Sequence, residues 1–290
     1  MHGIWENQIS INAQQEDIEE PLPSVAAFTD QSPGLFTDFV RSIDLPAAIA
    51  RDPYPLPLTS QREAYYGPDH FCYWLSGLYA FHDVVRTCDH LDVPLHRVLD
   101  LGCASGRVLR HFACQVDSLA GLYGADINLN HIAWINRHLP RHIVAFHSFS
   151  LPKLPLPDDC FDLVTAFSVF THIEAFDAFW LLELKRVLRP GGLAYITIQS
   201  ERSWAEMDEK WPVYKALARH PNFATASKNG KMDKDRLIFR WREEDSYSSN
   251  VFLSYDYVND VWGRIMDIME IRPNYPRFQD VVVLQKKNVV

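Results

Sequence analysis

The residues best suited to chemistry in this chain of 290 amino acids follow two short apolar runs. Asp100 lies just before a turn-forming segment, Gly102 to Gly106, and Asp126 ends the second run. A strand that turns through glycines into a helix lets a ligand approach bare backbone. A carboxylate at the end of the next strand can accept hydrogen bonds from both hydroxyls of an adenosine ribose. This spacing predicts a nucleotide-type cofactor site.

The pattern of the turn separates two classes of cofactor. A dinucleotide site needs G-x-G-x-x-G, with glycines and a helix amino end facing a pyrophosphate. Here Gly102 and Gly106 are glycines, and Ala104 takes the place of one glycine of a G-x-G-x-G pattern. Asp100 would repel a diphosphate and would attract a cation, such as the amino group and sulfonium of S-adenosylmethionine. The turn favours S-adenosylmethionine, while a nicotinamide site and a turn without any ligand stay open.

His172 is the candidate general base. It follows the predicted strand Phe161–Phe167, in the segment that leads to the next helix. A hydroxyl or ammonium nucleophile must lose a proton, and a histidine with a pKa near neutrality suits that step. The alternative is a structural role, in which His172 binds backbone at the helix start. Thr171 and Glu174 match the capping-box spacing, which predicts Thr171 as the helix cap.

Strands and helices must alternate to position these side chains. The predicted strands are Arg97–Leu101, Gly121–Ile127, Ile143–His147, Phe161–Phe167 and Leu193–Gln199, and the predicted helices are Arg107–Ala113, Asn130–Leu139, Glu174–Leu188 and Tyr257–Met266. This alternation predicts an α/β fold with a doubly wound, mostly parallel sheet covered on both faces. Two last strands, near 269–271 and 280–284, are joined by a link too short for a helical crossover. The sheet should therefore have seven strands, with the last one antiparallel.

The motifs together resemble class I S-adenosylmethionine-dependent methyltransferases of the small-molecule type, which have a Rossmann-like fold. The segments that carry the resemblance are Val98–Gly106, Ala125–Ile127, Leu154–Val164 and Leu188–Gly192. They occur in the family's order within residues 97–199, and the carboxyl end from Tyr257 to Leu284 resembles the closing helix and hairpin of the same fold.

The resemblance implies a set of residues that contact the cofactor. Residues that shape its turn or bind its ribose are Asp100, Gly102, Cys103, Ala104, Gly106 and Asp126. Ile127 and Phe149 would flank the adenine, Phe167 and Ser168 would line the methionine end, and Tyr66 would cover the cofactor or simply pack in the core. The sequence departs from the family at His147-Ser148, where an Asp or Asn often faces the adenine amino group.

The regions outside the motifs are expected to recognise the acceptor. We expect an amino-terminal arm and helical cover over residues 1–90, with a polar, acidic and peripheral start over residues 1–24. The S-adenosylmethionine-binding domain is expected over residues 91–290, with a substrate lid inserted at about 200–250. Within that insertion, the spacing of Trp204, Trp211 and Tyr214 suits one helical face, which packs on the core or lines an aromatic pocket.

Composition excludes several classes of function. Asp and Glu total 37 against 28 Lys and Arg, a net charge of −9, which argues against nucleic acid as a partner. The five cysteines form no C-x-x-C pair, so we expect no disulfide framework, no metal site and a cytoplasmic location. No stretch reaches the roughly 18 apolar residues of a membrane span.

The activity implied is methyl transfer from S-adenosylmethionine to an oxygen or nitrogen nucleophile of a small-molecule or saccharide-type acceptor. Two alternatives from other classes stay open. One is a catalytically inactive scaffold that binds the cofactor in the same fold, and the other is a nicotinamide-dependent oxidoreductase.

Overall fold

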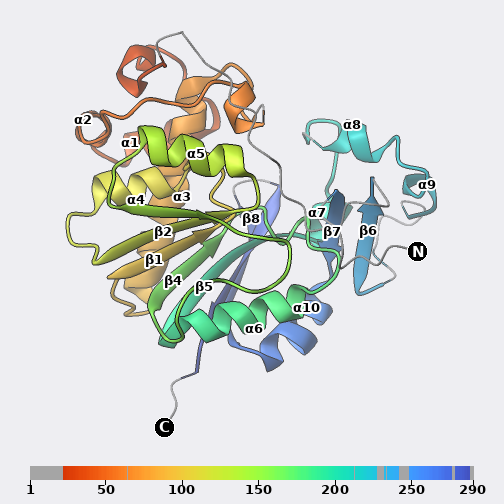
Figure 1. The fold of residues 1–290 in the computed structure, drawn as a ribbon. Coiled ribbons are helices and arrows are strands. Elements are labelled where there is room, and N and C mark those ends of the chain that lie inside the picture. Colours follow the sequence, from red (N-terminus) through yellow and green to blue (C-terminus); the bar gives the residue numbers. More distant parts are fainter. Residues whose placement is uncertain are drawn as a thin grey trace. The chain divides into compact units, whose positions relative to one another are not determined.

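The computed structural model describes residues 22–287 except 64, 212, 227–231, 233, 242–247 and 276–277. Most of the acidic start predicted as a peripheral arm therefore lies outside the described residues. The chain divides into two compact units, with the boundary between Ser148 and Phe149. The elements of each unit are labelled in Figure 1.

The first unit holds the strand–turn–helix units predicted from the sequence. Its strands are β1 (Arg97–Leu101), β2 (Gly121–Asp126) and β3 (Ile143–His147), and its α-helices are α1 (Thr37–Arg41), α2 (Leu45–Ala50), α3 (His70–His90), α4 (Leu109–Gln115) and α5 (Leu129–His138). Three short 3-10 segments are η1 (Val25–Phe28), η2 (Gly34–Phe36) and η3 (Ser60–Arg62). β2 pairs in parallel with β1 and with β3, and both α4 and α5 pack against β2.

Helix α3 packs closely against the turn that follows β1. Asp69 caps its amino end by accepting a hydrogen bond from the backbone N–H of Cys72, 2.8 Å away. At Gly77 an added Cβ would overlap the carbonyl group of Arg107, so only glycine permits this approach. The helix and the turn are therefore in backbone contact, which fixes the position of the residues after Gly106.

A buried ion pair ties the proline-rich segment before α3 to helix α4. The carboxylate of Asp52 accepts hydrogen bonds from Arg110 at 2.7 and 2.8 Å and from the indole of Trp74 at 2.7 Å. The side chains of Asp52 and Arg110 are fully buried. Burial alone would raise the pKa of Asp52, but Arg110, together with His111 and Trp74, outweighs burial, and the pKa lies below its usual value. Breaking such a pair leaves a buried charge uncompensated, which costs about 3–5 kcal/mol.

The second unit holds the remaining strands. They are β4 (Phe161–Ala166), β5 (Leu188–Ser200), β6 (Arg236–Arg240), β7 (Ser249–Leu253), β8 (Asp267–Tyr275) and β9 (Gln279–Gln285). Its helices are α6 (Asp177–Val187), α7 (Glu201–Ala205), α8 (Tyr214–Leu217), α9 (Phe223–Ala226), α10 (Tyr255–Val261) and the 3-10 segment η5 (Trp262–Arg264). β4 runs parallel to β5, whereas β9 lies antiparallel between β5 and β8.

The α/β class, the parallel pairing and the antiparallel last strand are confirmed. The predicted number of strands is too low, because the insertion contributes two more: β7 pairs in parallel with the end of β5, and β6 pairs antiparallel with β7. Both strands are only five residues long and neither alternates between buried and exposed positions, so no strand was predicted there. Among the described residues, no helix is both long enough and apolar enough to cross a membrane.

The aromatic residues of the insertion form a core of their own. The prediction of one helical face is wrong, because α7 ends at Ala205 and α8 begins only at Tyr214. Trp204 and Trp211 instead meet Phe239 of β6 and Phe252 of β7 in one buried cluster. The pairing of β6 with β7 brings these rings together, and not a shared helical face. The rings pack against one another in the cluster.

Candidate functional site

The turn between β1 and α4 has an unusual backbone. Gly102, Ala104 and Gly106 all have positive φ, at 68°, 46° and 79°. An alanine pays a steric cost in this left-handed region that a glycine does not. The conformation turns the backbone N–H of Ala104 toward the end of β2, where it donates to Asp126 over 2.8 Å. The sequence departure at Ala104 therefore leaves the turn intact.

Asp126 is a buried carboxylate that both neighbouring loops hold in place. Its Oδ2 accepts from the N–H of Ala104, and its Oδ1 accepts from the N–H of Asn128 at 2.7 Å. The residue is 8% exposed. Burial raises the pKa of Asp126, although His131 and the two N–H groups oppose the shift. Each oxygen keeps a second acceptor site, so the carboxylate can still receive two hydroxyl groups.

Asp100 and Cys103 are buried beneath the same turn. Asp100 lies in β1 opposite Gly124 of β2. Burial, together with the charges of Asp126 and Asp100, raises the pKa of the Cys103 thiol well above its usual value. The thiol stays protonated and packs against Gly124, where an added Cβ would come within 2.9 Å of Sγ. The charge beneath the turn is therefore that of the two carboxylates.

Tyr66 lies on the turn that precedes α3. Its ring meets that of Tyr65 edge-on, with centroids 4.9 Å apart, and the guanidinium of Arg107 lies 5.3 Å from the centre of the Tyr65 ring. Arg107 directly follows Gly106, so this aromatic pair is beside the glycine turn. Burial raises the pKa of Tyr66, which keeps the phenol neutral. The role of Tyr66 over the cofactor stays a prediction.

Two hydrogen bonds join the end of β2 to the end of β3. Half-buried Ile127 uses its carbonyl to accept a hydrogen bond from His147 Nε2 at 2.9 Å, and the N–H of Ser148 donates to the carbonyl of Asp126 at 2.8 Å. Where the resemblance expects an Asp or Asn side chain toward the adenine, this chain therefore uses its polar groups to fix the backbone.

Four other predicted site residues lie in the second unit: Phe149, Phe167, Ser168 and His172. Phe149 is 42% exposed, and the ring of Phe167 lies 5.5 Å from that of Tyr195. Ser168 has a positive φ of 58°, and its N–H donates to Thr197 Oγ1 at 2.7 Å. Strained backbone of this kind is concentrated at functional sites. The place of Ser168 at the methionine end of the cofactor stays a prediction.

His172 is oriented by a backbone carbonyl. Its Nδ1 lies 2.7 Å from the carbonyl oxygen of Ser249 in β7. A carbonyl only accepts, so Nδ1 carries the hydrogen, and in the neutral ring Nε2 carries the lone pair. A histidine held in one tautomer in this way has the form of a general base.

The segment between β4 and α6 differs from its prediction. Thr171 does not cap a helix, since α6 begins at Asp177 and Thr171 Oγ1 donates to the carbonyl of Ser168 at 2.6 Å. Glu174 is buried and forms an ion pair with Arg240 of β6, and it accepts from Ser249 Oγ at 2.7 Å. A charge-assisted pair is stronger than a capping bond, so Glu174 ties this segment to the insertion.

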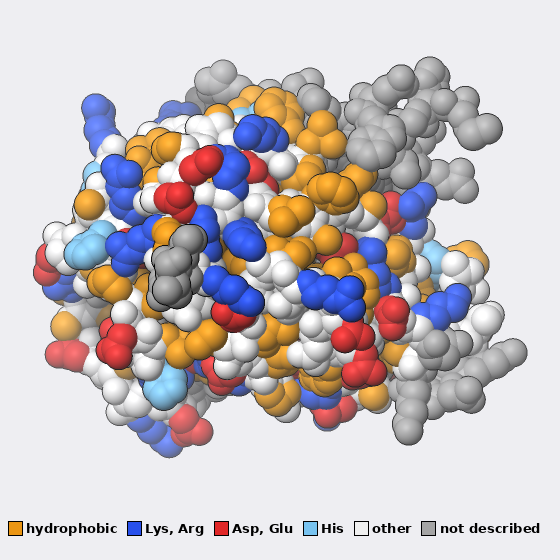
Figure 2. Space-filling model, turned by 90° about the horizontal axis from the view of Figure 1, so that it is seen from below, with side chains coloured by type: hydrophobic (Ala, Val, Ile, Leu, Met, Phe, Trp, Pro, Cys, Tyr) orange, Lys and Arg blue, Asp and Glu red, His pale blue; other side chains and the backbone are white. Residues whose placement is uncertain are grey.

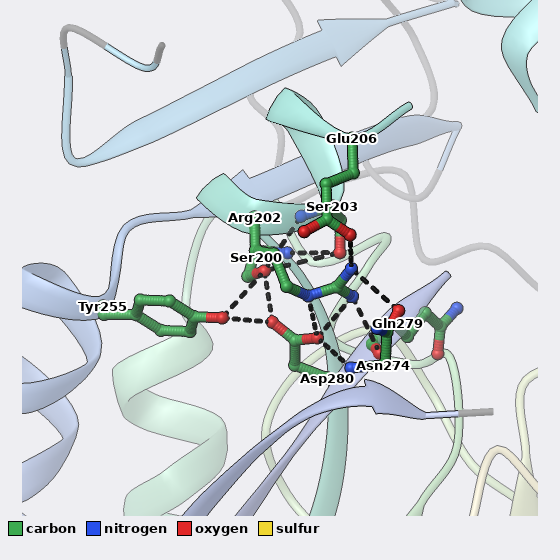
Figure 3. Close-up of polar contacts among 8 residues, drawn as sticks. All are labelled: Ser200, Arg202, Ser203, Glu206, Tyr255, Asn274, Gln279 and Asp280. Atoms are coloured by element: carbon green, nitrogen blue, oxygen red, sulfur yellow. Dashed lines mark hydrogen bonds and ion pairs between the residues drawn. The ribbon is translucent and has the colours of Figure 1, made fainter. Parts of the chain in front are cut away.

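A second polar network fixes the carboxyl end of β5 (Figure 3). The carboxylate of Asp280, fully buried in β9, faces Arg202 at 2.5 and 2.8 Å, Tyr255 Oη at 2.6 Å and Ser200 Oγ. Its neighbour Gln279 donates through Nε2 to Ser168 Oγ at 2.9 Å. Strands β5 and β9 and the starts of α7 and α10 are thus joined around one carboxylate, close to Ser168.

Several of these residues were not predicted from the sequence. Asn128 carried a usable signal, since an Asn before a helical pattern is a typical N-cap, and it caps α5 by accepting from the N–H of Asn130. No local pattern in the sequence pointed to Glu63, His131 or Gln279, because their partners are far away in the chain. In the part of the chain that the structure describes, no three His, Cys, Asp or Glu side chains gather as metal ligands.

The first unit thus has three features of nucleotide-cofactor domains: parallel strands, a glycine turn into a helix and a buried carboxylate at the end of the next strand. Residues 99–196 match the family model described as a methyltransferase domain. This segment is therefore similar to the methyltransferase domains of S-adenosylmethionine-dependent enzymes, in keeping with the α/β fold.

Two curated relatives illustrate the similarity. One is a ubiquinone/menaquinone biosynthesis C-methyltransferase of Cupriavidus taiwanensis, 32% identical over 126 residues, which are 42% of this chain and 50% of that protein. The other is a glycine/sarcosine/dimethylglycine N-methyltransferase of Actinopolyspora halophila, 25% identical over 66% of this chain and 33% of that protein. The matched part of the chain thus spans about half the length of the first relative and a third of the second.

Among solved structures, a S-adenosylmethionine-dependent methyltransferase from Clostridium acetobutylicum aligns with a TM-score of 0.49. The alignment covers 72% of this chain and 91% of that one, at 11% identity.

Proposed function

We propose that this protein transfers a methyl group from S-adenosylmethionine to an oxygen or nitrogen nucleophile of a small-molecule or saccharide-type acceptor. The observation that carries the proposal is the carboxylate of Asp126, held by the N–H groups of Ala104 and Asn128 at the end of β2. Pre-orientation by two backbone donors leaves it ready to accept the two hydroxyls of a ribose.

The other predicted residues take their roles around that anchor. Asp100 and Asp126 supply negative charge that suits a cationic cofactor and disfavours a diphosphate. Beside Asp100 and Asp126, the proposed cofactor contacts are Gly102, Cys103, Ala104, Gly106, Ile127, Tyr66, Phe149, Phe167 and Ser168. When bound, the cofactor supplies an electrophilic methyl carbon on a sulfonium, and the carbon–sulfur bond breaks as the bond to the nucleophile forms.

The protein's own contribution is alignment and removal of a proton. His172 is the proposed base: its Nδ1–H is held by the carbonyl of Ser249, so the neutral ring carries its basic lone pair on Nε2. Substrate recognition is assigned to the cover over residues 1–90 and to the lid at about 200–250, which Glu174 and Asp280 tie to the strand ends. Because the first relative is a C-methyltransferase, transfer to carbon is the second candidate.

The expected partner is a small molecule and not a nucleic acid. The net charge is −9. On the face drawn in Figure 2, Lys and Arg side chains have Asp and Glu side chains beside them. Such a surface does not favour binding to a phosphate backbone. The cytoplasmic location expected from the cysteine pattern stays a prediction.

The function is tested by incubating the purified protein with S-adenosylmethionine carrying a labelled methyl group and pools of hydroxylated, amino and saccharide acceptors. Transfer of label, lost in Asp126→Ala, supports the proposal and identifies the acceptor atom by mass spectrometry. Cofactor binding without transfer to any pool would favour the inactive scaffold. Binding of NADH in place of S-adenosylmethionine would favour the oxidoreductase.

A further inference from the structure

A chain of hydrogen bonds joins η3 and Glu63 to the glycine turn through His131. Glu63 Oε1 lies 3.2 Å from His131 Nε2, His131 Nδ1 lies 2.9 Å from Ser105 Oγ, and Ser105 Oγ donates to the carbonyl of Gln61 at 2.5 Å. We call Ser60–Glu63 the strap. His131 and Ser105 are buried, at 4% and 0% exposure. Water is therefore kept from the centre of the chain of bonds.

Counting hydrogens fixes the protonation state that satisfies this chain. Both of its ends, the Glu63 carboxylate and the Gln61 carbonyl, can only accept. Three hydrogen bonds between them need three hydrogens, and the Ser105 hydroxyl supplies one. The other two must come from His131, so its ring must carry hydrogen on both nitrogens. A neutral His131 has one N–H and leaves one of the three bonds unmade, whichever tautomer it adopts.

The charges around His131 favour the protonated ring. The charged groups that face it are Glu63, from the strap, and Asp126, from the end of β2; Ser105 faces it from the turn, and Gln61 adds a backbone contact from η3. Burial alone would lower the pKa of His131, but Glu63 and Asp126 outweigh burial, and the pKa lies above its usual value.

The strap is also linked to Asp126, through Asn128. Glu63 Oε1 also accepts from Asn128 Nδ2 at 3.2 Å, and the N–H of Asn128 donates to Asp126 at 2.7 Å. Glu63 itself has a left-handed backbone, with φ of 53°, which an L-residue keeps only where its surroundings hold it. Losing one bond of the chain therefore loosens the strap next to Asp126.

We propose that His131 is a positioning residue whose protonated ring holds the strap against the turn, so that affinity for S-adenosylmethionine falls as the pH rises above neutrality. The inference rests on the proposed function. Because the protonated form is the one that holds the strap, the contribution is fully present at acidic to neutral pH and is lost as His131 deprotonates. Losing one hydrogen bond would weaken binding about fivefold.

Glu63→Gln separates this effect from a merely structural one. A glutamine gains an amide N–H that can donate to Nε2 of neutral His131. Because Asn128 and His131 face the same atom of Glu63, this orientation gives up the bond to Asn128 at every pH alike. All three bonds then form with the neutral ring, and the pH dependence should disappear. His131→Asn should bind weakly at every pH, whereas the matched control His142→Asn, at an exposed histidine outside the chain of bonds, should behave as the wild type.

The experiment is calorimetric titration with S-adenosylmethionine at pH 6.0, 7.0, 8.0 and 8.8, together with an NMR pH titration of His131 without any ligand. The amino group of the cofactor titrates in the same range, near 8, so affinities are compared between variants at each pH. We expect the affinity of the wild type to fall about fivefold relative to Glu63→Gln as the pH rises, with the His131 resonance titrating over the same interval.

The outcomes distinguish a failure of the positioning role of His131 from a failure of the proposed function. Affinities that stay in a constant ratio between wild type and Glu63→Gln at every pH would overturn the positioning role. An NMR titration of His131 that shows a neutral ring already at pH 6.0 would overturn the chain of bonds itself. A protonated His131 in a protein that binds no S-adenosylmethionine at any pH would instead contradict the proposed function, and with it the link to affinity.

Discussion

The backbone N–H of Ala104 lies 2.8 Å from Oδ2 of Asp126, so the glycine turn and the end of the next strand form one hydrogen-bonded unit. The residues are 22 positions apart in the chain. Their contact requires the left-handed backbone at Ala104, with φ of 46°. The strained backbone of the turn therefore orients the carboxylate through this hydrogen bond.

Removing the anchor should weaken cofactor binding. Asp126→Ala deletes both acceptors for the ribose hydroxyls, and the affinity for S-adenosylmethionine should fall about ten- to a hundredfold. Calorimetry measures this directly. Asp117→Ala is the matched control, since that carboxylate is 86% exposed and pairs with Arg51 away from the turn. An unchanged affinity in Asp126→Ala would remove the ribose assignment.

The role of His172 can be separated from its structural bond. His172→Asn keeps a donor for the carbonyl of Ser249 but has no basic nitrogen. Turnover on the acceptor found in the screen should fall at least about a hundredfold while the affinity for the cofactor stays the same. His172→Ala loses the bond as well. If His172→Asn turns over normally and His172→Ala does not, the residue positions backbone and is not the base.

Gly77 is predicted to be intolerant of any side chain. A methyl group there would overlap the carbonyl group of Arg107, so α3 would have to move away from the turn. We expect Gly77→Ala to lower the free energy of unfolding by about 1–3 kcal/mol, as measured in urea. At Gly263 an added methyl group would only touch Ile268, at 3.4 Å, so Gly263→Ala serves as the control. Equal stability of the two variants would refute the close approach.

His111 should make the protein less stable in acid. Burial lowers its pKa to about 3, while its Nε2–H donates to the carbonyl of Trp74. The unfolded chain takes up a proton below its own pKa of about 6.5, and the folded chain does not until about pH 3. The unfolding free energy should therefore fall by about 1.4 kcal/mol per pH unit across that interval.

Urea titrations at pH 7.0, 5.5 and 4.5 measure this slope. His111→Gln should flatten it, whereas His142→Gln, at an exposed histidine, should leave it unchanged. A slope that is the same in all three proteins would assign the acid sensitivity to other groups. Asp52 adds a further loss only below its unfolded pKa of about 4, because its own pKa in the folded protein is lowered.

The sequence predicted what depends on local pattern. The run Val98 to Leu101 and the glycines after it gave β1 and the turn, because apolar strands and glycine breaks are local signals. Asp126 was predicted as a site residue because it ends the next apolar run. The hairpin of β8 and β9 followed from the short link between two β-rich segments.

What the sequence did not predict depends on contacts between distant residues. Glu174 pairs with Arg240, 66 positions away, and this contact overrides the capping box that its neighbours suggest. Glu63 and His131 meet over 68 positions, and neither has a motif around it. Strands β6 and β7 are recognisable only once Phe239 and Phe252 are seen to share a core with Trp204.

The central claim is that the buried carboxylate and the glycine turn bind S-adenosylmethionine. Isothermal titration of the protein with S-adenosylmethionine and S-adenosylhomocysteine, with NADH as the control, tests it most directly. Micromolar binding of the first two alone, lost in Asp126→Ala, is the result that this account predicts. Binding of NADH, or no binding of either sulfur compound between pH 6 and 9, would contradict it.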